Sequence, residues 1–457
     1  MINVYCSLHI RKIKHKMKFK LLLALVVLFI VSTFSDAKAY NLKDAITAAL
    51  QNNEKIQALG KKLEIAMLQK PKVVAEFLPN VALELNETFH KNRNFDNPSN
   101  PTKYHQGSLI LNIEQEIYSG GSTIAKIIAA DAEANVAYQD YIKELNDVIY
   151  QTINVYQGVL TNRELIKIQI QNVAMAEKHL EKSRIMVKSR AYTKSFLYLA
   201  KANLSEIKQH LEEYKVNQVE VEAHFQYYIG EKAPEKMEEI NLKQYKAPTL
   251  EDFKSLVNQK NPDILKAKSE LKASKQGINI ATSRLMPKIS LFGQLLRQDG
   301  PSHLSNNTLF KQQIRKDGDT YGVKMTIPVF SRGLEYLNIS EAKKKKKLSE
   351  HSLKSTVYGI QANVTTTWDK YVTNGIIYNL SRQAEKDYYQ TYLSIQAEFD
   401  VGAVTIFDVI KRQQEYNYHT VTRLQKEKDS KLALFGIYKL IGNLPQAIKD
   451  NNPIIKN

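Results

Sequence analysis

The chain has 457 residues, of which 25% are charged and 43% hydrophobic, a balance typical of a folded protein and not of a disordered one. Its formal net charge of +18 suits contact with a nucleic acid, an anionic lipid surface or an anionic solute. The single cysteine, Cys6, excludes a disulfide within the chain and any site built from several cysteines.

Residues 1–39 form a predicted secretory signal peptide. Basic residues precede an apolar run from Leu21 to Phe34, and a small-x-small cleavage motif ends at Ala39. The run is shorter than the roughly 20 residues of a spanning helix, so we expect cleavage and export and not a membrane anchor. Met1 and Met17 both remain candidate starts of translation. The exported part stays basic and would meet anionic lipid or solutes, with no nucleic acid as partner.

The rest of the chain is one unit written twice. Asn41–Asp44 aligns with Thr249–Asp252, and a second aligned block, at a slightly larger spacing, ends at Gly230 and Gly442. A chance match would not keep register over two such distances. We therefore predict a first repeat over residues 40–230, a polar linker over 231–248, a second repeat over 249–442 and a C-terminal tail over 443–457.

Each repeat has the same order of predicted elements. It opens with an amphipathic helical segment, residues 41–76 in the first copy and 249–285 in the second. Two stretches of alternating apolar and polar residues follow, each roughly the 9–11 residues that a tilted strand needs to cross a bilayer. The four stretches cover about residues 81–89, 109–117, 289–295 and 321–329, with polar loops predicted at 91–106 and 297–319.

The second half of each repeat is predicted to be two long helices. Proline, the strongest helix breaker, is absent from residues 102–233 and 329–444. A helix from Ser122 to Lys188 would be about 100 Å long at ~1.5 Å per residue. The predicted return helices run from Thr193 to Ile229 and, after a break near Gly402, from Thr405 to Ile441.

The strands constrain the assembly. No later apolar run is long enough for a spanning helix, so insertion into a membrane would need the strands. Four strands cannot close a barrel, and open strand edges are not tolerated in lipid. We therefore predict an oligomer that pools its strands, twelve from three chains. The odd-numbered apolar positions would face lipid, and the Glu, Asn, Ser and Thr positions would line a wet interior.

Particular segments resemble those of the TolC-like outer-membrane efflux proteins, or outer membrane factors. They are the duplication, the strand ends Tyr118–Gly120 and Phe330–Gly333, and the break from Phe399 to Val409. The resemblance covers residues 41–442. It implies a mainly α protein with a transmembrane β-barrel, made of two tandem repeats of helix, strand, strand, long helix and return helix. In the homotrimer, a 12-stranded barrel lies in the cell outer membrane and continues as a periplasmic α-helical tunnel.

The resemblance also implies a function. The family provides passive outer-membrane channels for tripartite drug efflux or type I protein secretion. A periplasmic adaptor (membrane fusion) protein and an inner-membrane pump recruit the channel, and lipid of the outer membrane surrounds the barrel. The substrate, and the choice between efflux and secretion, stay open at this point.

The resemblance places a gate at the turn between each long helix and its return helix. Asp408 would line the constriction of the periplasmic mouth. Thr405 and Asp408 also have the spacing of a capping box after a left-handed helix stop at Gly402, and the two roles are compatible. The candidate gate residues are Phe399, Gly402, Thr405, Phe407, Asp408 and Lys411 in the second copy, and Thr193 and Phe196 in the first.

The sequence departs from the family pattern at this gate. Lys411 stands where a second acid is expected, Val404 where a basic residue is expected, and Phe196 where an acid would pair with it. Because both members of that ion pair are missing, we expect apolar contacts, through Phe196 and Phe407, to hold the mouth closed.

Two further groups of residues have ordinary explanations beside functional ones. The run from Lys343 to Lys347 suggests an anionic partner, but lysines spread over more than one helical turn favour a solvated helix surface. Five aromatic residues in or beside the strands are candidates for a girdle at the membrane interface, although core packing explains them nearly as well. They are Phe89, Tyr118, Phe292, Tyr321 and Phe330.

No sequence motif indicates catalysis. The chain lacks HExxH, GxSxG, GxxxxGK[ST] and GxGxxG, and its histidines have no metal-ligand spacing. We therefore expect no enzyme, no cofactor and no metal. The alternatives to a channel are a periplasmic coiled-coil adaptor and a structural coiled-coil protein.

Overall fold

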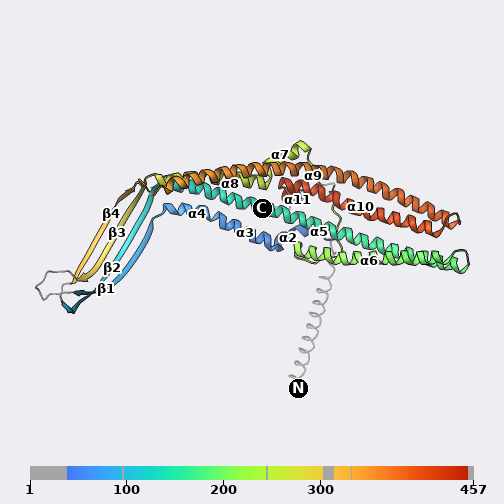
Figure 1. Ribbon diagram of the computed structural model, residues 1–457, viewed down its shortest axis with the longest axis horizontal. Helices are drawn as coiled ribbons and strands as arrows, with labels where there is room; N and C mark the ends of the chain where they lie inside the picture. Colours follow the sequence, from blue (N-terminus) through green and yellow to red (C-terminus); the bar gives the residue numbers. More distant parts are fainter. Residues whose placement is uncertain (1–38, 95–96, 243–244, 302–312, 331, 451–457) are drawn as a thin grey trace, which may run out of the picture.

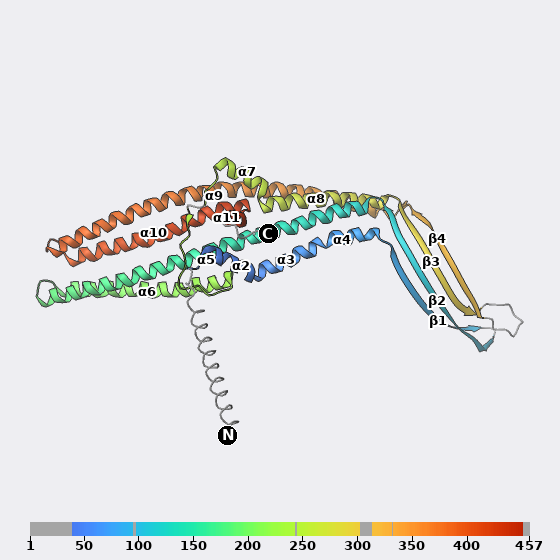
Figure 2. The same cartoon turned by 180° about the vertical axis from the view of Figure 1, so that it is seen from behind.

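The computed structural model describes residues 39–94, 97–242, 245–301, 313–330 and 332–450. The predicted signal peptide therefore lies almost wholly outside the described residues. The chain is a long rod of helices with a β-sheet at one end and, at the other, the two turns that join paired antiparallel helices (Figure 1). Viewed from behind, the same helices run side by side along the rod (Figure 2).

Both copies contain the same elements in the same order. The first copy has α2 (Leu42–Asn52), α3 (Glu54–Met67), α4 (Gln69–Val74), the 3-10 helix η1 (Ala75–Phe77), β1 (Asn80–Asn94), β2 (Asn97–Ser119), α5 (Ser122–Lys188) and α6 (Lys194–Ile229). The second has α7 (Leu250–Lys260), α8 (Pro262–Thr282), the 3-10 helix η3 (Ser283–Leu285), β3 (Lys288–Pro301), β4 (Gln313–Thr326), α9 (Leu334–Asp400) and α10 (Ile406–Ile441). A short helix, α11 (Leu444–Asp450), follows.

The long helices agree with the sequence prediction. Helices α5 and α9 each have 67 residues, which corresponds to about 100 Å at ~1.5 Å per residue. Each folds back onto its return helix, so that α5 pairs with α6 and α9 with α10. The two hairpins also meet each other, because α10 packs along α5.

The opening segments are broken at an asparagine in each copy. The predicted segment 41–76 is divided into α2, α3, α4 and η1. The break between α2 and α3 falls at Asn53, which is extended and caps α3 by accepting from the backbone N–H groups of Lys55 and Ile56. The equivalent Asn261 caps α8 in the same way. An Asn side chain that accepts these N–H groups ends one helix and starts the next.

The four strands form one antiparallel sheet in the order β1-β2-β3-β4. In the polar loops predicted at residues 91–106 and 297–319, the described residues are strand, with Lys91 paired with Lys103 and Arg297 with Asp317, while residues 95–96 and 302–312 lie outside the described part of the chain. That prediction was wrong because it used side-chain polarity, whereas the ladder is made by backbone groups that pair whatever the side chains are. At its other end β4 is shorter than predicted. It stops at Thr326, so the predicted strand positions after it, up to Val329, are not strand.

The pairing register places most of the large apolar residues of the four strands on one face, while Ile110, Phe292 and Leu296 lie on the other. Val81 pairs with Ile113, Leu111 with Leu295, and Leu291 with Val323. A bulge between Glu116 and Tyr118 brings Tyr118 into register with Ile289 and keeps it on this apolar face. Beyond Leu295 the same face becomes charged, with ion pairs between Arg297 and Asp317 (3.9 Å) and between Arg315 and Asp299 (3.4 Å).

The main core lies where α2, α11 and the segment after α6 wrap around the long helices. Tyr156 of α5 is fully buried in it, and its hydroxyl lies 2.8 Å from the carbonyl oxygen of Tyr40 and 2.7 Å from that of Glu238. This hydroxyl connects the middle of the long helix to the chain that enters the first copy and the chain that leaves it. Burial raises the pKa of Tyr156, so the hydroxyl stays protonated and donates.

Replacement of Tyr156 by Phe should lower the free energy of unfolding by about 1 kcal/mol, because the hydroxyl that donates to the part-buried carbonyls of Tyr40 and Glu238 is lost, although the Tyr40 carbonyl still accepts from the backbone N–H of Glu238. Thermal unfolding of the detergent-solubilised protein measures the change. Tyr138→Phe is the matched control, since Tyr138 lies on the same helix and is 46% exposed. Equal effects of the two substitutions would contradict the role assigned to the Tyr156 hydroxyl.

Candidate functional site

The far ends of the two helical hairpins contain the residues predicted to form the gate. Helix α9 ends at Asp400, and the chain turns through Gly402, at a φ of +81°, before α10 begins. Here the backbone N–H of Ala403 donates to the carbonyl of Glu398. The α5–α6 turn has the same hydrogen bond, from Ala191 to Met186. Both ends are therefore Schellman-type helix stops, which require a left-handed residue.

The left-handed residue differs between the copies. The α5–α6 turn has Arg190 at a φ of +59°, where the second copy has Gly402. At the strand-to-helix junctions the situation is reversed, with Gly120 (+67°) in the first copy and Arg332 (+61°) in the second. A side chain in this conformation costs about 1–2 kcal/mol, a cost that glycine does not have.

Thr405 and Asp408 form the capping box that the sequence predicts. The backbone N–H and the hydroxyl of Thr405 donate to the same Asp408 oxygen, at 2.9 and 2.6 Å. These hydrogen bonds, led by that of the hydroxyl, hold the pKa of Asp408 below its ordinary value of 3.8. Lys411, one turn further on, is exposed.

An apolar cluster connects the two hairpins just behind their turns. Phe399 is 5% exposed in it, and Phe196 is partly buried against it and stacked on Tyr192 at 4.5 Å between ring centroids. Phe407 stays 46% exposed and outside the cluster. The buried members of the cluster are Leu180, Ala200, Tyr392, Phe399, Ile406, Val409 and Ile410.

Polar contacts also link the hairpins near the turns. The Lys182 ammonium on α5 lies 3.1 Å from a carboxylate oxygen of Asp400 at the end of α9, and 5.1 Å from the centroid of the Phe399 ring. Further along the hairpins, toward the sheet, Gln414 of α10 donates to Asn203 and Glu206 of α6. The hydroxyl of the exposed Thr193 forms a hydrogen bond with the hydroxyl of Ser195 in the same turn. Sequence reasoning missed the Lys182–Asp400 contact, because the two residues are far apart in the chain and carry no motif.

The second face of the sheet is mostly polar, and several of its side chains are joined by hydrogen bonds between strands. Asn112 donates to Glu84 at 3.3 Å and accepts from Gln294 at 2.9 Å, so one chain of side chains crosses three strands. Ser290 donates to Glu114 at 3.2 Å on the same face. These are the Glu, Asn and Ser positions that the sequence predicts for a wet interior.

The five candidate girdle residues do not share one face or one level. Tyr118 and Phe330 lie at the helical end of the sheet, whereas Phe89 lies at the far end, paired with His105. Tyr321 lies between these levels, opposite Gly293, and is 82% exposed. Phe292 is on the polar face, where its ring covers Gly322.

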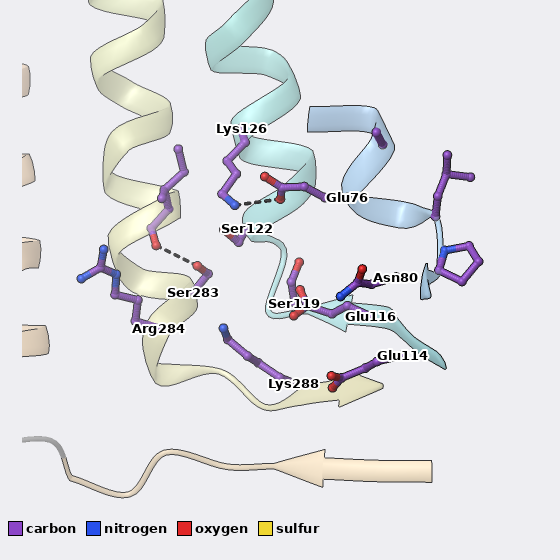
Figure 3. A pocket seen from close by; sticks show the side chains of 14 residues that line it. Glu76, Asn80, Glu114, Glu116, Ser119, Ser122, Lys126, Ser283, Arg284 and Lys288 are labelled. Atoms are coloured by element: carbon purple, nitrogen blue, oxygen red, sulfur yellow. Dashed lines mark hydrogen bonds and ion pairs between the residues drawn. The ribbon is translucent and has the colours of Figure 1, made fainter. Parts of the chain in front are cut away.

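A cavity of about 690 Å³ lies on the polar side of the sheet where the strands meet the helices. Figure 3 shows Lys288 of β3 and Glu116 of β2 pointing into it, while Lys126 and Glu76 form an ion pair at 2.7 Å across its upper wall. Its walls thus carry both signs of charge. Among the described residues, no group of three His, Cys, Asp or Glu side chains is arranged as a metal site.

A rod of long helices that ends in a sheet with one apolar and one polar face defines a chain that supplies one segment of a channel wall. Within the described part of the chain, none of the helices has the length and apolar character to cross a membrane. The comparisons with known proteins agree with this class.

A model of the family "Outer membrane efflux protein" matches residues 45–189 and 255–443. A search of curated proteins found no sequence that matches the chain. The fold is similar to the outer membrane channel CmeC of Campylobacter jejuni, at 18% identity, 90% coverage of this chain, 88% of that chain and a TM-score of 0.76. It is also similar to VceC of Vibrio cholerae, at 16% identity, with 88% of this chain and 96% of that chain covered and a TM-score of 0.73. The open state of MtrE of Neisseria gonorrhoeae is similar too, at 16% identity, with 88% of this chain and 89% of that chain covered and a TM-score of 0.69.

The chain belongs to the outer membrane efflux protein family. It is therefore a protein of the cell outer membrane, with a helical part that extends into the periplasm. This family consists of channels and not of enzymes, so the alternatives of an adaptor or a structural coiled coil are not retained.

Removal of the Asp408 carboxylate should weaken the start of α10. The charged form stabilises the fold fully above the ordinary pKa of 3.8, and this stabilisation is lost as the pH falls through the lowered pKa. We expect Asp408→Ala to lower the free energy of unfolding by about 1 kcal/mol at neutral pH and by less in strong acid. Thermal unfolding at the two pH values measures this, with Asp369→Ala on the surface of α9 as the control. An equal loss at both pH values would contradict the role of the charge.

Proposed function

We propose that three copies of this chain assemble into a passive exit duct that carries drugs or secreted proteins across the outer membrane. The observation that carries the proposal is the open four-stranded sheet with its two unlike faces. In the described part of the chain, β1 and β4 each have a strand partner on one side only. Unpaired backbone groups are too costly in lipid, and pairing β4 of one copy with β1 of the next removes every edge.

The helices support the same closure. Exposed apolar side chains lie on α9 along one edge of the rod and on α3, α4 and α6 along the other, edges that are well separated in Figures 1 and 2. Large exposed apolar side chains gathered on one helix edge commonly indicate a protein–protein interface. Two different edges fit a ring in which each copy contacts the next head to tail. The residues include Tyr336, Leu337, Leu348 and Leu380 on α9, and Met67, Leu68, Val216 and Tyr227 on the opposite edge.

In this trimer the apolar face of the sheet meets lipid and the polar face lines the passage. The girdle proposal then retains Tyr118 and Phe330 at the periplasmic interface and Phe89 at the outer one. Tyr321 would contact the lipid between these levels. Phe292 faces the passage and is not proposed for the girdle.

The helical ends form the gate in this proposal. Phe196 and Phe399, in the apolar cluster, and the Lys182–Asp400 contact hold the two hairpins of each copy together. Phe407 is exposed within one copy and is free to contact its equivalents in the trimer. A periplasmic adaptor protein and an inner-membrane pump would dock at these ends and open them.

The experiment that tests the duct is deletion of the gene with two readouts, drug sensitivity and the set of secreted proteins. Greater drug sensitivity supports efflux, and loss of particular secreted proteins supports type I secretion. Fractionation of the complemented strain should show heat-modifiable trimers in the outer membrane. A monomeric, soluble periplasmic protein would contradict the proposal.

Loss of the Lys182–Asp400 contact should make the closed channel leak. We expect Lys182→Ala and Asp400→Ala each to raise the closed-state conductance in planar bilayers several-fold, and the double variant to add little, because both remove the same contact. Phe196→Ala should also raise it, because the cluster loses an aromatic ring. Lys178→Ala is the matched control, one turn away on α5 and exposed. Wild-type conductance in all three single variants would show that neither contact holds the gate.

A further inference from the structure

The two helical ends of the chain differ in charge at equivalent positions. The first-copy end has Lys188 and Arg190 where the second-copy end has Asp400 and Gly402. It also has Lys194, whose equivalent in the second copy is the fully buried Ile406. The first-copy turn, residues 188–194, therefore has three basic residues and no acidic one.

These three side chains are available to a partner. Lys188, Arg190 and Lys194 are all exposed at the outermost point of the rod, in and beside the turn between α5 and α6 (Figure 1). Within the described part of the chain, none of them is in an ion pair, unlike Lys182 and Arg184 on the same helix, which pair with Asp400 and Glu181. The turn therefore presents its positive charge to the solvent.

Arg190 is the basic residue of this turn that has an unusual backbone conformation. It occupies the left-handed position of the helix stop, which the second copy fills with Gly402 in the same hydrogen-bonded turn. Glycine would make the turn without strain, so an arginine here costs stability and places a guanidinium at an exposed position. Arg332 has the same conformation at a strand-to-helix junction, so what distinguishes Arg190 is its place between Lys188 and Lys194 at the end of the rod.

The second-copy end has a different chemistry. Val401 is 82% exposed and Phe407 46%, and the nearby Asp400 contacts Lys182 of its own chain. In the proposed trimer, basic ends and apolar ends alternate around the mouth. A protein that docks there would need acidic groups opposite one kind of end and apolar groups opposite the other.

We propose that the first-copy turn is a docking surface for acidic residues at the helical ends of the periplasmic adaptor, with Arg190 as its central contact. This inference rests on the proposed function for the identity of the adaptor. A lipid surface is not the partner, because the turn lies one long helix away from the sheet, about 100 Å for the 67 residues of α5. The guanidinium, with several donors in a planar fork, suits a carboxylate better than a lysine would.

The test uses the intact trimer and hexaglutamate as an acidic probe, added in planar bilayers to the side that bears the helical ends. We expect the peptide to block wild-type channels reversibly. Arg190→Gly should weaken the block at least threefold, and Lys188→Glu with Lys194→Glu at least tenfold. Higher salt should weaken the wild-type block, because exposed charges are screened.

Arg332→Gly is the matched control. It removes the same charge and the same left-handed strain, but at the junction between β4 and the start of α9, next to the sheet and far from the helical turns. Both glycine variants should unfold at an equal or higher temperature than the wild type, which excludes misfolding as a cause of lost binding. Of the two glycine variants, only Arg190→Gly should weaken the peptide block and, in cells, reduce the drug resistance or secretion that the channel supports.

The outcomes separate this inference from the proposed function. If wild-type protein forms no channels and its deletion changes neither drug sensitivity nor secretion, the proposed function fails. If channels form but the block is unchanged in Arg190→Gly and in the double lysine variant, the basic turn is a solvated surface and the docking inference is wrong. A block that Arg332→Gly weakens equally would also overturn it.

Discussion

The structure depends on the need of every backbone N–H and C=O group in lipid for a hydrogen-bond partner. The four strands satisfy one another except along β1 and β4, the outer edges of the sheet. The sheet also has two chemically different faces, one apolar and one joined by the hydrogen bonds among Glu84, Asn112 and Gln294. A sheet of this kind has no stable place in water or in lipid as a single copy. Closure with further copies satisfies both edges, and it determines that the apolar face lies outside.

The duplication explains the shape, and its departures from symmetry explain where function is concentrated. Both copies build a hairpin of equal length, since α5 and α9 match residue for residue. They differ at the turns, where Arg190 and Gly402 make the same helix stop with different side chains. A tube made from two similar hairpins thus presents two kinds of end, one basic and one apolar, to whatever docks at its mouth.

Much of the fold follows from patterns that the sequence shows directly. The absence of proline and the spacing of apolar residues located the long helices and their breaks, because a helix of this length tolerates few interruptions. Alternation located the strands and their faces, but not their ends. The pairing of Lys91 with Lys103 shows why, since backbone ladders extend past the apolar band wherever the register allows. Of the gate, the Thr405–Asp408 cap and the left-handed helix stop at Gly402 were local enough to be predicted. Lys182 and Asp400 meet only through the packing of two hairpins, and one sequence contains no signal for that contact.

The most direct test of the central claim is a cross-link between β4 of one copy and β1 of the next. The only cysteine, Cys6, lies in the predicted signal peptide, so cysteines placed at Leu83 and Val323 on the apolar face would be the only ones in the exported protein. Treatment of outer membranes with a short bifunctional maleimide should then yield covalent trimers and no larger species on a denaturing gel. Cross-links confined to single chains, or a ladder that continues beyond three copies, would contradict a barrel closed by three chains.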